Sequence, residues 1–155
     1  MMGHLWNNPG TYSLVLRLGR PVLIRVSRKT FRLGKGIYVY TGSARNPGGL
    51  GARISRHLSK QKKIHWHIDH LTQSLHCTIL GVVYCVSNRR LESRICRLFS
   101  EDSRFVAMSG FGASDDIEND SHLFLSRSNY RSCIRFTISK YKYLLKSHPS
   151  LLLVE

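Results

Sequence analysis

An arginine and a histidine one helical turn apart are the first residues here whose types and spacing suit chemistry. Arg53 and His57 are separated by four positions, so on a helix they lie on the same side. Shortly before them a β-rich run carries Tyr38 and Tyr40, and strand alternation places both rings on one face. An arginine fork matches phosphate, while tyrosine and histidine can transfer protons. We therefore interpret this stretch as an active-site frame.

Local signals predict the elements that would position this frame. Residues 36–44 are rich in β-branched and aromatic residues and are punctuated by glycine, which indicates a strand. Residues 46–49 (NPGG) indicate a turn. Leu50, Ile54 and Leu58 then recur at helical spacing. The sequence therefore predicts a strand, a turn and a helix in direct succession.

The residues before this frame predict two more strands. Residues 10–18 and 22–26 are short β-rich runs, and the Gly-Arg-Pro turn at 19–21 between them indicates a hairpin. Residues 31–43 would then form the third strand. Three consecutive strands with short connections favour a small antiparallel sheet.

The remaining sequence alternates between helical and strand patterns. The sequence predicts a helix over 64–75 and then a buried strand over 78–86. Ser87 or Asn88 would cap the next helix, in which Leu91, Ile95 and Leu98 face the core. A loop at 109–112 and strands at 121–125 and 134–138 follow. We therefore expect an α+β fold, with a small antiparallel sheet flanked by helices. One domain would cover residues 10–140, between a leader at 1–9 and an unassigned basic and apolar tail at 141–155.

The charge balance indicates a polyanionic partner. Lys and Arg number 24 against nine Asp and Glu, which gives a net charge of +15 over 155 residues. Nucleic acid is the default partner of such a surface, and an anionic membrane surface is the second. No apolar run of about eighteen residues and no signal-peptide core is present, so we expect no membrane span and a cytoplasmic location. The four cysteines, Cys77, Cys85, Cys96 and Cys133, are expected to be buried thiols.

Two short motifs on separate predicted strands resemble the half-motifs of the GIY-YIG nuclease superfamily. They are residues 10–12 (GTY) and residues 40–42 (YTG). Arg53, His57 and Glu92 fall where that superfamily keeps its remaining active-site residues. Five further segments resemble a prokaryotic branch of GIY-YIG-like domains that stands alone or is fused to a DNA-repair glycosylase of the endonuclease III type: residues 38–44, 56–58, 65–69, 110–115 and 121–124.

The chain departs from this pattern in three places. Thr11 and Thr41 stand where isoleucines are usual, which matters little because those side chains serve packing. An asparagine that many members carry shortly after the glutamate has no match in residues 101–104. The closer branch carries cysteines after its Ser-Asp pair, where this chain has residues 116–120 (DIEND). The missing asparagine and the small size keep open an alternative, a non-catalytic nucleic-acid-binding module that acts beside a repair enzyme.

The chemistry of the side chains is consistent with what the resemblance implies. Hydrolysis of a phosphodiester needs a base for water, a metal ion and a cation for the developing charge. Tyr12 or Tyr40 can supply the base if a neighbouring cation lowers the phenol pKa from about 10. His57 can relay the proton or hydrogen-bond the phosphate, and Arg53 can bind that phosphate through its fork. Glu92 is a lone carboxylate, which suits Mg²⁺ or Mn²⁺.

We therefore expect a Mg²⁺-dependent endonuclease that cleaves DNA in repair or processing. A basic face would bind the DNA, and its expected members are Arg45, Arg56, Lys60, Lys62 and Lys63; Tyr38 is a further expected nucleic-acid contact. Residues 36–38 spell GIY literally, but Tyr38 lies only two residues from Tyr40 on the same strand. The superfamily instead places its two tyrosines on neighbouring strands. We therefore expect the first and third strands to pair through Tyr12 and Tyr40, with Tyr38 at the edge of the site or in contact with DNA.

A histidine-rich segment offers a rival metal site. The candidate zinc ligands are His65, His67, Asp69 and His70, with His57 and Cys77 as further members. On the predicted helix His65 and His67 diverge by about 200°, so they do not share a face. We therefore favour packing and hydrogen-bonding support as the role of this segment.

A second rival cluster contains the residue types of a hydrolase triad. Its members are Ser114, Asp115 and His122. No nucleophile elbow surrounds Ser114, which disfavours that reading. The nearby residues 110–112 (GFG) are too short to cradle a phosphate and indicate a turn.

Overall fold

The structure, a computed structural model, describes residues 7–154, so most of the predicted leader lies outside the described residues. The strands in this range are β1 (Gly10–Leu18), β2 (Val22–Val26), β3 (Lys29–Leu33), β4 (Gly36–Ala44), β5 (Cys77–Val86), β6 (Phe105–Ala107), β7 (Leu123–Ser126) and β8 (Ser150–Leu153). The helices are α1 (Gly49–Leu58), α2 (His67–Thr72), α3 (Glu92–Ser100) and α4 (Tyr130–Leu145).

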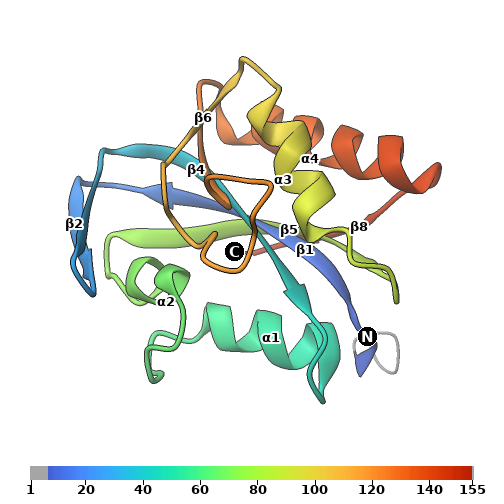
Figure 1. Cartoon of the computed structure of the whole chain (residues 1–155), viewed down its shortest axis with the longest axis horizontal. Helices are drawn as coiled ribbons and strands as arrows, with labels where there is room; N and C mark the ends of the chain where they lie inside the picture. Colours follow the sequence, from blue (N-terminus) through green and yellow to red (C-terminus); the bar gives the residue numbers. More distant parts are fainter. Residues whose placement is uncertain (1–6, 155) are drawn as a thin grey trace.

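The described residues form a three-layer α+β fold around one antiparallel sheet. Its strand order is β6-β7-β4-β1-β5-β8, and a separate two-stranded sheet contains β2 and β3. Helices α1 and α2 cover one face of the large sheet, and α3 and α4 cover the other (Figure 1). Each face therefore buries its own apolar cluster, and the predicted fold class is confirmed.

The pairing of β1 with β4 positions the two tyrosines that the sequence singles out. Leu14 lies opposite Tyr40, and Tyr12 lies opposite Gly42. Because side chains alternate along a strand, Tyr12, Tyr38 and Tyr40 all point to the face covered by α1 and α2. The prediction that the first and third strands pair is confirmed, but Tyr12 and Tyr40 do not face each other: they lie two register positions apart on the same face.

The predicted hairpin between the first two strands is wrong. β1 already has β4 on one side and β5 on the other, so no edge remains for β2. β2 pairs with β3 instead, from Val22 opposite Leu33 to Val26 opposite Lys29. The single strand predicted over residues 31–43 is accordingly divided between β3 and β4, which belong to different sheets.

The two predicted central helices are shorter than their apolar patterns. α2 covers only His67–Thr72; at its start the Asp69 carboxylate accepts a hydrogen bond from the backbone amide of Trp66. The outer members of its predicted stripe are exposed, Ile64 at 39% and Leu75 at 89%. α3 begins at Glu92, and neither Ser87 nor Asn88 caps it. Its buried residues are Ile95, Cys96 and Phe99, while Leu98 is only half-buried.

The strand predicted over residues 134–138 is wrong, because this segment lies inside α4. Asn129 caps the helix by accepting a hydrogen bond from the Ser132 amide. Cys133, Thr137 and Tyr141 are all fully buried at four-residue spacing, which is the helical period. The alternating apolar residues at 134, 136 and 138 fit a helix as well as a strand.

The structure adds elements at both sides of the sheet. β6 was not predicted, and β7 begins two residues later than the predicted strand at 121–125. In the unassigned tail, α4 continues to Leu145 and β8 then pairs with β5. All four cysteines are buried free thiols, as expected. Among the described residues, no helix has the length and apolarity to cross a membrane.

Candidate active site

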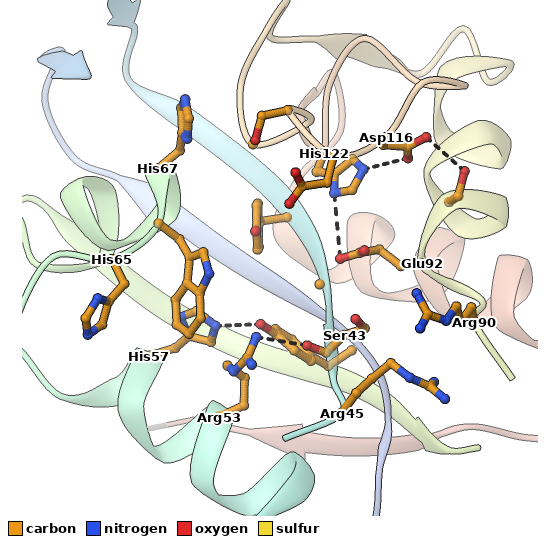
Figure 2. Close-up of a pocket in the computed structure, with 18 of the residues that line it drawn as sticks. Ser43, Arg45, Arg53, His57, His65, His67, Arg90, Glu92, Asp116 and His122 are labelled. Atoms are coloured by element: carbon orange, nitrogen blue, oxygen red, sulfur yellow. Dashed lines mark hydrogen bonds and ion pairs between the residues drawn. The ribbon is translucent and has the colours of Figure 1, made fainter. Parts of the chain in front are cut away.

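A cavity of about 770 Å³ lies where β1, β4, α1 and the start of α3 come together. The segments 64–70 and 112–122 form most of the rest of its wall (Figure 2). The structure brings all five sequence-predicted catalytic residues to this cavity: Tyr12, Tyr40, Arg53, His57 and Glu92. These residues lie up to 80 positions apart in the chain, so the fold alone places them together.

The glycine after Tyr40 is required by the position of Tyr12. In the β1–β4 pair, Tyr12 lies directly opposite Gly42 and its ring crosses over that residue. A Cβ atom at position 42 would lie 2.6 Å from the Tyr12 hydroxyl, which is too close for any side chain. The absence of a side chain at Gly42 therefore gives Tyr12 its place in the cavity wall.

Tyr12 and His57 form a buried hydrogen-bonded pair across the β1–α1 interface. The Tyr12 hydroxyl lies 2.6 Å from His57 Nε2, and both residues are 1% exposed. Burial, with Lys62 nearby, lowers the pKa of His57 to about 3, so the ring is neutral at pH 7. Its Nδ1 is buried without a hydrogen-bond partner in the described residues. The pair is therefore an uncharged link that can move a proton.

The condition for a tyrosine base, a phenol pKa lowered by a neighbouring cation, is not met in the structure. Burial raises the pKa of Tyr12 above its usual value of about 10, and the nearby Arg53 guanidinium only partly offsets this. Burial raises the pKa of Tyr40 as well, and negative charge on the neighbouring Glu92, or on Tyr12 if it were ionised, adds to the effect. Both phenols are therefore protonated at neutral pH, which favours proton relay over a standing phenolate base.

Arg53 is held in the cavity by the strand before it and by an indole ring. Its Nη1 donates a hydrogen bond of 2.9 Å to the Ser43 carbonyl at the end of β4. Its guanidinium carbon lies 4.2 Å from the centre of the Trp66 ring, a cation–π contact. These contacts leave donors of the fork free to bind an anion in the cavity.

The histidine-rich segment supports this arrangement through Asp69. The fully buried Asp69 carboxylate accepts both fork hydrogen bonds of Arg56, at 2.7 and 2.8 Å. It also accepts hydrogen bonds from the His65 and Trp66 amides. Arg56 in turn lies 4.5 Å from the Trp66 ring centre. Asp69 therefore fixes Trp66, which fixes Arg53, and this fits the packing role inferred for the segment.

Asp69→Asn should destabilise the fold by about 2–3 kcal/mol at pH 7, because it removes a charge-assisted bidentate pair. Burial would raise the pKa of this carboxyl, but the Arg56 and amide hydrogen bonds outweigh it and hold the pKa at about 2. The folded pKa is thus below the unfolded value of about 3.9. The Asp69 contribution is complete above about pH 5 and is lost as the pH falls toward 2.

Urea unfolding at a series of pH values measures this effect. The free energy of unfolding should fall more steeply between pH 5 and 2 for the natural chain than for Asp69→Asn. Asp120→Asn, at an exposed aspartate, is the matched control and should follow the natural chain. Equal slopes for the natural chain and Asp69→Asn would contradict the role assigned to Asp69.

The opposite wall of the cavity is acidic. Four of the chain's nine acidic residues line the cavity: Glu92, Asp115, Asp116 and Glu118. His122 joins two of them, with Nε2 2.8 Å from Asp116 and Nδ1 3.7 Å from Glu92 (Figure 2). Burial raises the pKa of Glu92; His122 opposes this shift, and the Asp116 charge adds to it. A cation beside Glu92 would relieve this accumulation of negative charge.

These residues fit a magnesium ion but not a zinc ion. Among the described residues, no group of three or more His, Cys, Asp or Glu is placed to hold a metal. Zn²⁺ sites use three or four such ligands, whereas Mg²⁺ commonly takes one or two carboxylates and keeps several waters. The Glu92 side chain, 31% exposed and on the cavity wall, meets the second requirement.

Most residues predicted to bind nucleic acid are committed to contacts inside the protein. Tyr38 was placed at the site edge or on DNA, but it is 1% exposed and donates to the Gly34 carbonyl. Lys60 Nζ donates to the carbonyls of Thr72, Ser74 and Cys77. Lys62 Nζ donates to two carbonyls near the end of α1 and to the Thr72 hydroxyl, and burial lowers its pKa to about 8.

Arg56 is likewise paired, with Asp69. The burial of Tyr38 removes it from contact with DNA, whereas DNA binding by Arg56, Lys60 and Lys62 stays a prediction, with their donors engaged inside the protein. Two members of the predicted basic face remain accessible. Lys63 is exposed, and Arg45 is exposed at the cavity rim, where it donates to the carbonyls of Asn88 and Arg89. Arg90 joins Arg45 at this rim, although sequence reasoning did not single it out as a binding residue.

Sequence reasoning missed two partners in the site, Trp66 and Asp116. A tryptophan three residues before an aspartate in the first turn of a helix could have indicated Trp66, because its aromatic face attracts cations. Asp116 carries no such signal, because its pairing with His122 depends on how the 112–122 segment folds. The structure also counts against a triad of Ser114, Asp115 and His122: the histidine bonds to Asp116, although all three residues line the cavity.

The fold and the cavity define an α+β domain with a site at the end of its central strands. One wall of this site is positively charged and the other is acidic, and the site contains tyrosine and histidine. The chain matches the family described as a domain of unknown function, DUF123, over residues 11–143. This match covers most of the sequence, so the chain belongs to the DUF123 family. Neither the curated proteins nor the solved structures give a significant match.

Proposed function

We propose that this protein belongs to the GIY-YIG nuclease superfamily and hydrolyses DNA phosphodiester bonds with Mg²⁺ or Mn²⁺. One observation carries the proposal: Tyr12, Tyr40, Arg53, His57 and Glu92 converge on one cavity from four separate elements. A merely structural role for each side chain gives no reason for this convergence. By the resemblance, the setting is DNA repair or processing, and a DNA-repair glycosylase is the proposed partner.

The two walls of the cavity suggest how a DNA strand would lie. The scissile phosphate would bind the Arg53 fork, while Arg45 and Arg90 at the rim would attract neighbouring phosphates. Glu92 on the acidic wall would hold the divalent ion, which supplies Lewis-acid polarisation of the phosphate when it is bound. The cleavage position is thereby set between the two walls.

The tyrosine–histidine pair would handle the proton. Because Tyr12 and His57 are both neutral and hydrogen-bonded, the Tyr12 hydroxyl would accept a proton from the attacking water as it donates its own proton to His57 Nε2. Tyr40 lies beside this pair, with its ring centre 6.4 Å from that of His57. It could orient the attacking water without carrying charge.

A non-catalytic nucleic-acid-binding module is the second candidate. Two observations favour it: burial raises the pKa of Tyr12, and His122 lies 3.7 Å from the carboxylate assigned to the metal. In such a module the cavity would hold a phosphate through Arg53 without hydrolysis. The two candidates differ in whether DNA is cut.

Incubation of the purified chain with labelled DNAs tests the proposal. The panel contains duplex, nicked, flap and four-way-junction forms, each with Mg²⁺, Mn²⁺ or EDTA. We expect cleavage of at least one form with either metal ion and none with EDTA, because Glu92 needs a cation to serve catalysis. Denaturing gels measure the products.

Two controls make the result decisive. Arg53→Lys keeps a charge but loses the fork, so it should reduce cleavage by at least about tenfold. Arg97→Lys, at an exposed position on α3 outside the cavity, should cleave like the natural chain. Binding of every DNA without cleavage of any would select the module instead.

A further inference from the structure

The segment inserted between β1 and β4 carries only positive charges. Residues 19–36 contain no acidic residue. They contain six basic residues, all exposed: Arg20, Arg25, Arg28, Lys29, Arg32 and Lys35. The segment folds as the β2–β3 hairpin, which protrudes from one side of the molecule (Figure 1). We call this segment the basic hairpin.

The two faces of the basic hairpin differ in character. Ile24, Phe31 and Leu33 face inward and are 8% exposed or less. The outward face carries two cross-strand pairs, Leu23 opposite Arg32 and Arg25 opposite Thr30. The inward face therefore fixes the hairpin to the domain, while the outward face and the tip present positive charge to solvent.

Aromatic contacts hold the basic hairpin beside the candidate active site. The Phe31 ring centre lies 5.9 Å from that of His67 in α2 and 5.1 Å from that of Phe111. A second cavity, of about 440 Å³, lies between the hairpin tip and residues 110–120. Val26, His67 and Ser114 line both cavities. The hairpin tip and the active-site cavity thus border one continuous depression.

The cations of the basic hairpin have no hydrogen-bond or ion-pair partner in the part of the chain that the structure describes. Within residues 7–154, none of these six side chains donates a hydrogen bond, forms an ion pair or stacks on an aromatic ring. Lys60 and Lys62, by contrast, use their donors on backbone carbonyls of their own domain. Unpaired cations keep their full capacity to neutralise an external anion, so the basic hairpin is the better candidate for phosphate contacts.

We propose that the basic hairpin binds the phosphate backbone of DNA that flanks the strand held in the active-site cavity. The inference rests on the proposed function for the position of the strand, but its contacts lie outside the catalytic set. DNA fits this surface because it offers a row of phosphates, which a ribbon of two five-residue strands can follow over about 17 Å. The hairpin fixes the DNA while the cavity selects the bond.

A charge-removal pair of variants tests this inference. The hairpin variant combines Arg25→Gln, Arg28→Gln, Lys29→Gln and Arg32→Gln. The matched control combines Arg131→Gln, Arg135→Gln, Lys142→Gln and Lys146→Gln, at exposed positions in or next to α4 that line neither cavity. Both variants lose four positive charges, so they separate local contacts from long-range attraction. All eight positions are exposed, and equal thermal unfolding midpoints verify the folds.

Fluorescence anisotropy with a labelled 20-base-pair duplex measures the affinity across a salt series in EDTA. The hairpin variant should bind at least about tenfold more weakly near 100 mM salt. The slope of log affinity against log salt should fall by about three to four units, near 0.9 for each lost phosphate contact. The control variant should change affinity by less than about threefold.

Equal losses in the two variants, or no loss in either, would overturn the inference. Loss of binding to vesicles of phosphatidylserine and phosphatidylcholine, with DNA binding retained, would overturn it in favour of a membrane surface. Failure of the proposed function is distinguishable, because binding is measured without metal ion. If DNA binding depends on the hairpin but no DNA is cleaved, this inference stands and the proposed nuclease function fails. If the hairpin variant cleaves DNA with an unchanged KM, the nuclease function stands and this inference fails.

Discussion

Glu92→Gln is expected to abolish Mg²⁺-dependent cleavage, with a loss of about a thousandfold or more, while DNA binding stays within about threefold. The substitution keeps the shape of the side chain and removes the charge that would hold the ion. Metal ions contribute several kcal/mol of transition-state stabilisation, and each 1.36 kcal/mol is tenfold in rate. Single-turnover cleavage across a Mg²⁺ series measures the effect, because weakened metal binding would appear as a shifted midpoint.

Glu118→Gln is the matched control for this substitution. Glu118 also lines the cavity and carries the same charge, but it is exposed and bonds to the Ser93 hydroxyl. We expect it to change cleavage by less than about fivefold. If Glu92→Gln cuts normally, Glu92 is only a carboxylate in the first turn of α3, where it interacts favourably with the helix dipole.

Local sequence signals were sufficient for the elements that position the tyrosines and α1. The bounds of β1 and β2 match the sequence prediction, and α1 begins within one residue of it. These elements have strong local determinants: alternation in the strands, the Asn-Pro-Gly-Gly turn, and Leu50 and Ile54 one helical turn apart. The same signals brought Arg53 and His57 to one side of α1, where both line the cavity.

The destination of β2 could not be inferred from local signals. A Gly-Arg-Pro turn indicates that the chain reverses, but it does not indicate which strand the next run will pair with. That choice depends on β5, more than 50 residues later, which occupies the second edge of β1. The strand prediction at 134–138 is wrong for a related reason. A run of three alternating apolar residues is too short to distinguish the period of a strand from that of a helix.

Charge and composition indicated how many cations the chain has, but not which of them are free. Lys60, Lys62 and Arg56 follow α1 or lie within it, and the carbonyls at helix ends need donors. The fold satisfies those carbonyls with these cations, and it buries Asp69 against Arg56. The six cations of the basic hairpin, by contrast, are exposed and lie on a two-stranded ribbon away from those helix ends. Which cation pairs with which acceptor depends on the tertiary structure, so it cannot be inferred from the sequence.

Tyr12→Phe and Tyr40→Phe are each expected to reduce DNA cleavage by at least about a hundredfold, the usual scale for a lost acid–base group. Tyr12→Phe removes the hydroxyl that bonds to His57 Nε2 and so breaks the proposed proton path. Tyr40→Phe removes the hydroxyl proposed to orient water. Tyr38→Phe is the matched control on the same face of β4, and it should leave cleavage unchanged within about threefold.

The control substitution, Tyr38→Phe, also removes a hydrogen bond, so it has a measurable effect on stability. Tyr38 donates its hydroxyl to the Gly34 carbonyl, so Tyr38→Phe should cost about 1 kcal/mol in the free energy of unfolding. If Tyr38→Phe abolishes cleavage while Tyr12→Phe cleaves normally, the tyrosine of the first half-motif is Tyr38 and not Tyr12.

A double substitution separates proton relay from structural support. If Tyr12 and His57 act as one unit, Tyr12→Phe combined with His57→Ala should cleave about as slowly as the slower single variant. If each residue acts alone, the two losses should multiply. Unfolding measurements on all three variants identify any loss that comes from the fold, since the pair is buried between β1 and α1. Multiplying losses would contradict the relay and leave His57 with the phosphate alone.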